Sequence, residues 1–160
     1  MPDMLVKLYD LPGLEGAIEH ASAQGIVIRR ALSLEKPRLV EWIKLHFTPW
    51  VAEVEAAFCR QPVACFMALR DREILGFACY DATCRNFFGP EGVLPAERGR
   101  GLGRGLLLAA LHAQRAQGYA YSIIGGVGPA QFYARTVKAV LIEASTPGLY
   151  AGILRAKPPG

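Results

Sequence analysis

Hydrophobic positions alternate between extended and helical spacing along the first third of the chain. Residues 5–8 form a short alternating run and residues 26–28 a run of β-branched residues, and each predicts a strand. Between them, residues 14–24 have helical spacing that ends at a glycine. Two further helical stretches follow, on either side of Pro49, so this part of the chain predicts strand, helix, strand and then two helices.

Three extended segments occupy the middle of the chain. Residues 64–69 and 74–80 are apolar, and the polar turn Asp71-Arg72-Glu73 between them predicts an antiparallel hairpin. Residues 86–94 predict a third strand, which Gly89-Pro90 interrupts as at a bulge or a splayed edge. The middle of the chain therefore predicts the centre of an antiparallel sheet.

The last part of the chain alternates helix and strand. Leucines and alanines from residue 106 onward follow helical spacing up to Gly118, and residues 120–124 form an apolar strand. Pro129 opens another helix, and residues 140–154 predict a hairpin that turns at a Pro-Gly pair. Together these elements predict an α/β fold, with a mixed, mostly antiparallel central sheet flanked by helices in one domain over residues 1–160.

Composition narrows the function classes. Of 160 residues, 52% are hydrophobic and 20% are charged, which is the balance of a globular domain. The net charge of +4 is too weak and too scattered for a nucleic-acid surface. The four cysteines form no C-x-x-C pair and no histidine stands at zinc spacing, so we expect reduced thiols and no metal. With neither an apolar leader nor a run of about 20 apolar residues, we expect a cytoplasmic protein without membrane contact.

A glycine- and arginine-rich segment, residues 97–105, lies between a predicted strand and a predicted helix. Glycines let the backbone curl, so that several N–H groups turn toward one point. The first amides of a helix lack acceptors, and the positive end of the helix dipole attracts an anion. Arginines add charge-assisted hydrogen bonds to phosphate oxygens. The segment therefore predicts a phosphate-binding site.

Two common nucleotide motifs do not fit this segment. A Walker loop ends in Gly-Lys-Ser/Thr, whereas Gly103-Arg104-Gly105 stands here. Glycines at every second position do not match G-x-G-x-x-G, which also belongs beside the first strand of a parallel unit. A module for some other nucleotide and a solvated turn without a ligand are the alternatives that remain.

The segment resembles the R/Q-x-x-G-x-G/A motif of the GNAT acetyltransferase superfamily through Arg98, Gly101 and Gly103. Residues 92–95 resemble the splayed strand of that family, and residues 129–135 resemble its A-x-x-F-Y-x-K/R helix. The resemblance implies a GNAT-like acyl-CoA N-acyltransferase fold. It also implies an acetyl-CoA-binding core at residues 64–145 and an acceptor-side region at residues 1–60.

The resemblance also implies roles for individual residues. Backbone amides from Arg100 to Arg104 are expected to wrap the pyrophosphate of acetyl-CoA. The amide of Val93 is expected to polarise the thioester carbonyl, and Tyr133 to protonate the leaving thiolate. The full set of residues expected to contact the coenzyme is Gly92, Val93, Leu94, Arg98, Gly99, Arg100, Gly101, Leu102, Gly103, Arg104 and Phe132.

The chain departs from the family pattern at two places, and neither supplies a base. Residues 136–140 replace the Gly-Phe that follows the tyrosine helix, and Gly126 to Pro129 stand where the family has an asparagine. Glu91 is the carboxylate closest to Val93 and is our candidate general base. Residues two apart share a face of a regular strand, although the Gly89-Pro90 break interrupts this one.

These observations predict an acetyl-CoA-dependent N-acetyltransferase. Its expected reaction is direct attack of a small-molecule primary amine on the thioester. A catalytically silent acyl-CoA-binding or sensing module and acetylation of a protein amine are the alternatives. A homodimer is expected from the family alone.

Overall fold

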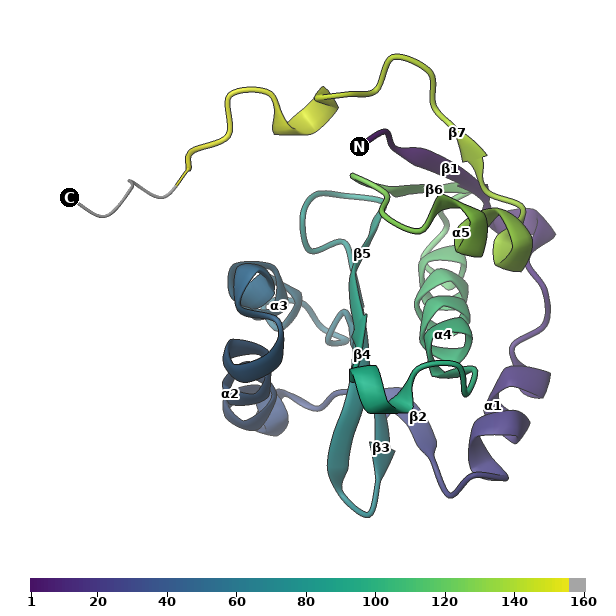
Figure 1. Ribbon diagram of the computed structural model, residues 1–160, viewed down its shortest axis with the longest axis vertical. Coiled ribbons are helices and arrows are strands. Elements are labelled where there is room, and N and C mark those ends of the chain that lie inside the picture. Colours follow the sequence, from purple (N-terminus) through teal and green to yellow (C-terminus); the bar gives the residue numbers. More distant parts are fainter. Residues whose placement is uncertain (156–160) are drawn as a thin grey trace.

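A seven-stranded sheet with the order β2-β3-β4-β5-β6-β1-β7 runs through the computed structural model, which describes residues 1–155 (Figure 1). Neighbouring strands are antiparallel except β5 and β6, which are parallel. This confirms the mixed, mostly antiparallel sheet that the sequence predicts. The strands are Met4–Lys7 (β1), Val27–Arg30 (β2), Cys65–Arg70 (β3), Glu73–Tyr80 (β4), Phe87–Val93 (β5), Tyr121–Ile124 (β6) and Val140–Leu141 (β7).

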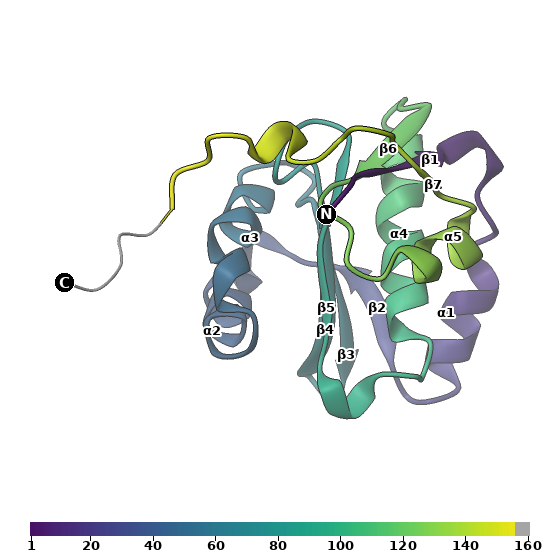
Figure 2. The ribbon, with the colours of Figure 1, turned by 45° about the horizontal axis from the view of Figure 1, so that its top comes forward.

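Helices cover both faces of the sheet (Figures 1 and 2). Helices α2 and α3 lie on one face, and α1, α4 and α5 lie on the other. The sequence predicts helices in all five of these regions, and they are Glu15–Ser22 (α1), Lys36–His46 (α2), Val51–Ala57 (α3), Leu102–Ala116 (α4) and Ala130–Val137 (α5).

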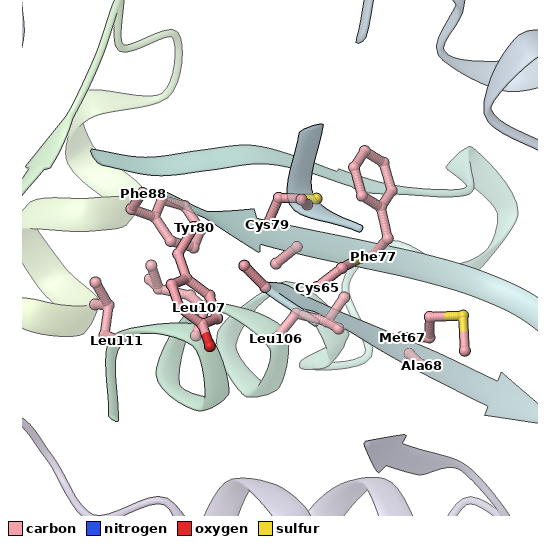
Figure 3. Packing of buried hydrophobic residues seen from close by; sticks show 14 of the residues in the cluster. Cys65, Met67, Ala68, Phe77, Cys79, Tyr80, Phe88, Leu106, Leu107 and Leu111 are labelled. Carbon is pink, nitrogen blue, oxygen red and sulfur yellow. The ribbon is translucent and has the colours of Figure 1, made fainter. Parts of the chain in front are cut away.

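The core lies on both sides of β4, in which every residue after Glu73 is buried. A strand that is covered on both faces is apolar throughout, as the run at residues 74–80 is. On one face, Phe77 packs edge-on against Trp42 and Phe47. On the other face, leucines of α4 fill the space beneath β3 and β4, as Figure 3 shows for Leu106 and Leu107.

Helix α4 begins at Leu102, four residues before the apolar run that predicts it. Two of the glycines are therefore helical. A Cβ on Gly105 would lie 2.4 Å from Cδ1 of Ile28, so this glycine lets α4 pack closely against β2. The glycine-rich segment thus has two structural parts, a turn at residues 99–101 and the first turn of a helix.

The predicted hairpin at residues 140–154 does not form. Strand β7 ends at Leu141, and a 3-10 turn, Gly148–Tyr150, stands where the second strand was expected. The hydroxyl of Ser145 donates to the carbonyl of Ile142 at 2.7 Å and accepts from the amide of Asp3 at 2.8 Å. Because these bonds close a turn directly after β7, the chain leaves the sheet before a second strand can pair.

Candidate active site

The sheet opens between its two parallel strands. Strands β5 and β6 pair only at Phe87 with Ile123 and at Phe88 with Ile124, and β5 continues without β6 beyond them. The residue that follows the paired positions is Gly89, and then Pro90, which has no N–H to donate. A cleft of about 830 Å³ lies at this opening, and residues from both helical layers line it. The break that the sequence places in this strand is therefore the place where the sheet divides.

The backbone of β5 turns toward the opening at Val93. The amide of Leu94 donates to the carbonyl of Leu75 at 2.9 Å, which places that pair among the hydrogen-bonded positions of the antiparallel ladder. Because such positions alternate along a strand, the amide and carbonyl of Val93 point away from β4. The carbonyl accepts from Nε of Arg98 at 3.2 Å. The Val93 amide is thus available to an extended ligand in the gap.

The turn at residues 99–101 has the backbone conformation that its glycines predict. Gly99 and Gly101 have φ values of +79° and +82°. The carbonyl of Arg100 accepts from Nε2 of Gln24 at 3.0 Å, and Nε2 of His20 lies 3.1 Å from it. Since C=O and N–H of a trans peptide point in opposite directions, the Gly101 amide points away from α1.

Six successive amides, at residues 99–104, donate no hydrogen bond to any other group in the described part of the chain. The last three of them belong to the first turn of α4, where the helix dipole is positive. Gly103, in that turn, lies close to the cleft, because a Cβ on it would be 3.6 Å from Oε1 of Glu91 and 3.7 Å from the ring of Phe132. This row of free donors fits the phosphate site that the sequence predicts.

Glu91 lies on the α4 side of β5 and lines the cleft as a half-buried residue whose Oε1 is buried. Its Oε1 has no hydrogen-bond partner within the described residues. Burial raises the pKa of the Glu91 carboxyl well above its usual range, and the neighbouring Tyr133 hydroxyl offsets part of that rise. Val93 lies on the same side, because its Cγ2 and Leu106 of α4 both face Gly76. A carboxyl with a raised pKa and a free oxygen is suited to accepting and returning a proton.

Tyr133 reaches the same place from α5. Its ring meets those of Phe132 and Phe88 edge-on, with centroids 5.1 and 6.2 Å away, and its side chain is 8% exposed. Burial, and then the negative charge of Glu91, raise the pKa of the Tyr133 hydroxyl. The hydroxyl is therefore protonated at neutral pH and acts as a hydrogen-bond donor.

The predicted site residues divide into two groups. Six of them line the cleft: Glu91, Gly92, Val93, Arg98, Phe132 and Tyr133. Of the others, Leu94 directly follows β5, and Gly99, Arg100, Gly101, Leu102, Gly103 and Arg104 lie in the turn and at the start of α4. At two of these positions no side chain can contact the coenzyme directly. Leu102 is 1% exposed and belongs to the core, and Gly92 is covered by the ring of Phe47 on the opposite face.

Sequence reasoning missed part of the cleft. Glu53 of α3, Thr83 and Tyr150 all line it, and no motif marks them. Phe47 and Trp50 both line the cleft and pack against the core, and their rings stack at 5.5 Å with an 11° interplanar angle. The signal for the missed residues lies in tertiary contacts and not in local spacing.

The tail that follows β7 forms one wall of the cleft, and its position gives a testable prediction. A Cβ on Gly125 would lie 2.6 Å from the Tyr150 hydroxyl and 3.0 Å from the ring of Phe87. We expect Gly125→Ala to displace Tyr150 and to make the tail more sensitive to limited proteolysis. Gly128→Ala is the control, because a Cβ there meets nothing within 4 Å. Equal proteolysis of both variants would contradict the packing of Tyr150 on Gly125.

No cluster of three or more His, Cys, Asp or Glu residues within 1–155 is arranged to hold a metal ion. In the same part of the chain, no helix has the length and apolar character to cross a membrane.

Comparisons with solved structures agree with this architecture. The GCN5-related glucosamine N-acetyltransferase region of a fungal multi-domain GH3 beta-N-acetylglucosaminidase aligns with a TM-score of 0.72 and 17% identity, over 88% of this chain and 19% of that one. A GCN5-related N-acetyltransferase from Sphaerobacter thermophilus aligns with 0.68 and 18% identity, over 88% and 48%. A GNAT family acetyltransferase from Brucella melitensis in complex with acetyl-CoA aligns with 0.54 and 20% identity, over 73% and 86%. The chain thus spans less than half the length of the first two.

Comparison of the sequence with protein-family models identifies the family. No curated protein sequence matches the chain. The family model described as "Acetyltransferase (GNAT) family" matches residues 28–136, a span that includes the opening of the sheet, the glycine turn and Tyr133. This span is more than half of the chain, and the structural neighbours share its fold. The chain belongs to the GNAT family of acetyltransferases.

Proposed function

We propose that the protein transfers an acetyl group from acetyl-CoA to a primary amine of a small molecule, by direct attack of the amine on the thioester. The observation that carries this proposal is the row of six free amides at residues 99–104 beside a cleft that contains Glu91 and Tyr133. The free amides suit the pyrophosphate of the coenzyme. The two titratable groups suit the proton transfers that aminolysis of a thioester requires.

The substrates would lie across the opening of the sheet. The amides of the glycine turn and the first turn of α4 would hold the pyrophosphate, and the exposed Arg98 and Arg104 would add charge. The pantetheine arm would extend along β5, where the Val93 amide points into the gap. Aimed at the thioester oxygen, that amide would stabilise the negative charge of the tetrahedral intermediate by about 2.7–4 kcal/mol, the value of an oxyanion-hole donor.

One proton must move from nitrogen to sulfur as the amide bond forms and the C–S bond breaks. An alkylammonium of pKa about 10.4 must first lose a proton to solvent to become a nucleophile. During attack, the neutral amine would release its second proton to the ionised carboxylate of Glu91. The departing thiolate would take a proton from Tyr133, and Glu91 would return its proton to the tyrosine. Amine and acetyl-CoA thus give amide and free thiol, with both side chains restored.

The raised pKa of Tyr133 explains why Glu91 is needed in this scheme. Even at an ordinary pKa near 10, a phenol transfers its proton to a thiolate of pKa about 8.5 at a cost of about 2 kcal/mol. Burial raises the pKa of Tyr133 and makes that transfer costlier. Concerted return of a proton from Glu91 removes this cost, because no phenolate accumulates.

The proposal is tested by mixing the protein with acetyl-CoA and a panel of primary amines and following release of free thiol. Amine-dependent thiol release, with the acetylated amine identified by mass, supports it. Binding of CoA without acetyl transfer to any amine, including lysine-containing peptides, would identify a silent binding module instead. Transfer only to peptides would place the acceptor among protein amines.

The hydroxyl of Tyr133 can be removed alone. We expect Tyr133→Phe to lower kcat about 3- to 10-fold, because the thiolate loses one neutral hydrogen bond of about 0.5–1.5 kcal/mol and takes its proton from solvent instead, while CoA affinity stays within twofold. Steady-state kinetics and calorimetric titration with CoA measure the two quantities. Unchanged kcat would contradict the role given to the hydroxyl, and loss of CoA binding would make the residue structural.

A further inference from the structure

The cleft reaches the face of the sheet opposite Glu91 and Tyr133, and one carboxylate stands there. Glu53 lies in α3 and lines the cleft together with Thr83. The hydroxyl of Thr83 donates a hydrogen bond to Oε1 of Glu53, which fixes the direction of the carboxylate. Six lysine and arginine side chains within residues 1–155 form ion pairs, all of them with other carboxylates, and none pairs with Glu53. The carboxylate is therefore oriented and without a cationic partner in this part of the chain.

The electrostatic surroundings on this side are negative. After burial, the charges of Glu53 and Asp3 are the main causes that raise the pKa of the Tyr150 hydroxyl on the wall of the cleft. The one basic side chain among the lining residues is Arg98, which belongs to the coenzyme end and bonds to Val93. Met1 also lines the cleft, and its α-amino group forms no ion pair with Glu53. A ligand in this half of the cleft thus meets a carboxylate that no cation of the described residues pairs with.

The walls around Glu53 are aromatic. Phe47 and Trp50 stack with their rings nearly parallel, and both line the cleft. Tyr150, whose pKa is raised by burial and then by the charge of Glu53, lies on another wall of the cleft. Aromatic faces attract an ammonium group and also accept an alkyl chain, so they suit a molecule that is apolar between charged ends.

We propose that the acceptor is an amine with a second positive charge, which Glu53 binds on the α3 side while the reacting amine lies at the gap between β5 and β6. This inference rests on the proposed acetyl transfer. The reacting nitrogen must be neutral to attack, so it cannot form the ion pair that Glu53 offers. A second ammonium group in the same molecule forms that pair and aligns the reacting end, and an apolar spacer fits the aromatic walls.

Three acceptors with six carbon atoms each separate this proposal from simple apolar binding: hexylamine, 1,6-diaminohexane and 6-aminohexanoate. With acetyl-CoA, we expect kcat/KM for the diamine to be at least about tenfold higher than for hexylamine, the contribution of one charge-assisted hydrogen bond, because only the diamine can pair with Glu53 while its reacting nitrogen is neutral. The lowest kcat/KM is expected for 6-aminohexanoate, because its carboxylate faces like charge. Equal kcat/KM values for all three would overturn the proposal.

Variants locate the effect. We expect Glu53→Gln to reduce kcat/KM for the diamine to that for hexylamine and to leave kcat/KM for hexylamine unchanged, with a smaller loss for Thr83→Val. Glu55→Gln is the control, since Glu55 lies in the same helix, is exposed and is outside the cleft. If Glu53→Gln slows hexylamine acetylation as much as diamine acetylation, Glu53 acts on the reacting amine and the inference is wrong. If calorimetry shows that the wild type binds the diamine more tightly than Glu53→Gln does, and the diamine is never acetylated, the proposed function fails while the binding site stands.

Discussion

Replacing Glu91 by glutamine is expected to lower kcat about 100- to 10,000-fold, the contribution of general acid–base catalysis. Glutamine keeps the shape of the side chain but can neither accept nor return a proton. Coenzyme binding should persist, since the amides at residues 99–104 are unchanged. Steady-state kinetics with a preferred amine and calorimetry with CoA measure the two effects.

The raised pKa of Glu91 predicts that both kcat/KM and thermal stability depend on pH, and that Glu91→Gln changes both dependences. Wild-type kcat/KM is expected to fall as pH decreases through the raised pKa of Glu91, because the base must be ionised. This limb should disappear in Glu91→Gln. The contribution of Glu91 to the free energy of unfolding should instead be most favourable at low pH. A carboxyl whose pKa is raised on folding stabilises the folded state at low pH, and that contribution is lost as pH increases. The Tm of the variant should therefore exceed that of the wild type increasingly at higher pH.

Retention of wild-type turnover in Glu91→Gln would exclude Glu91 as the base. Glu53→Gln and Glu91→Gln should differ in kind, because the first acts on acceptor affinity and the second on turnover. Because Glu53 is a second carboxylate that lines the cleft, on the other side of the sheet, the comparison tests which of the two acts as the base. Loss of the low-pH limb with only one of the two variants identifies the group that takes the proton.

The parts of the fold that local sequence specifies were predicted. The hairpin of β3 and β4 follows from two apolar runs around a polar turn, and Asp71 and Arg72 adopt positive φ values there. The interruption at Gly89-Pro90 marks the opening of the sheet, since a residue without an N–H cannot continue the pairing. The free amides of the glycine segment follow from the same kind of local chemistry.

The parts that depend on distant contacts were not predicted. Strand β1 lies between β6 and β7, although nothing in residues 4–7 indicates these partners. The expected hairpin after residue 140 fails because Ser145 bonds to Asp3, which is 142 positions away in the sequence. Glu53 joins the site only because α3 packs beside the opening of the sheet. Apolar periodicity identifies the buried face of α3, and it carries no information about which polar residue will face a cleft.

Replacing Gly101 by alanine is expected to weaken CoA binding about 10- to 150-fold. Gly101 has a φ of +82°, where an L-residue is strained by about 1–2 kcal/mol, and a Cβ there would lie 2.9 Å from Cδ2 of His20. Nε2 of that ring lies 3.1 Å from the carbonyl oxygen of Arg100. Displacing the ring would break this contact between the turn and α1, and the amides of the turn would shift. A hydrogen bond to a charged group contributes about 1.5–3 kcal/mol, so the loss of one amide–phosphate bond gives the expected range.

Gly25→Ala separates loss of binding from loss of stability. Gly25 has a φ of +72° with nothing within 4 Å of a Cβ, so it carries the same strain without the His20 contact. Both variants should lower Tm by roughly 2–8 °C, as about 1–2 kcal/mol does for a protein of this size. Only Gly101→Ala should lose coenzyme affinity in calorimetry. If both variants bind CoA equally well, the turn does not position the phosphate, and the amides of residues 99–104 lose the role on which the proposed reaction depends.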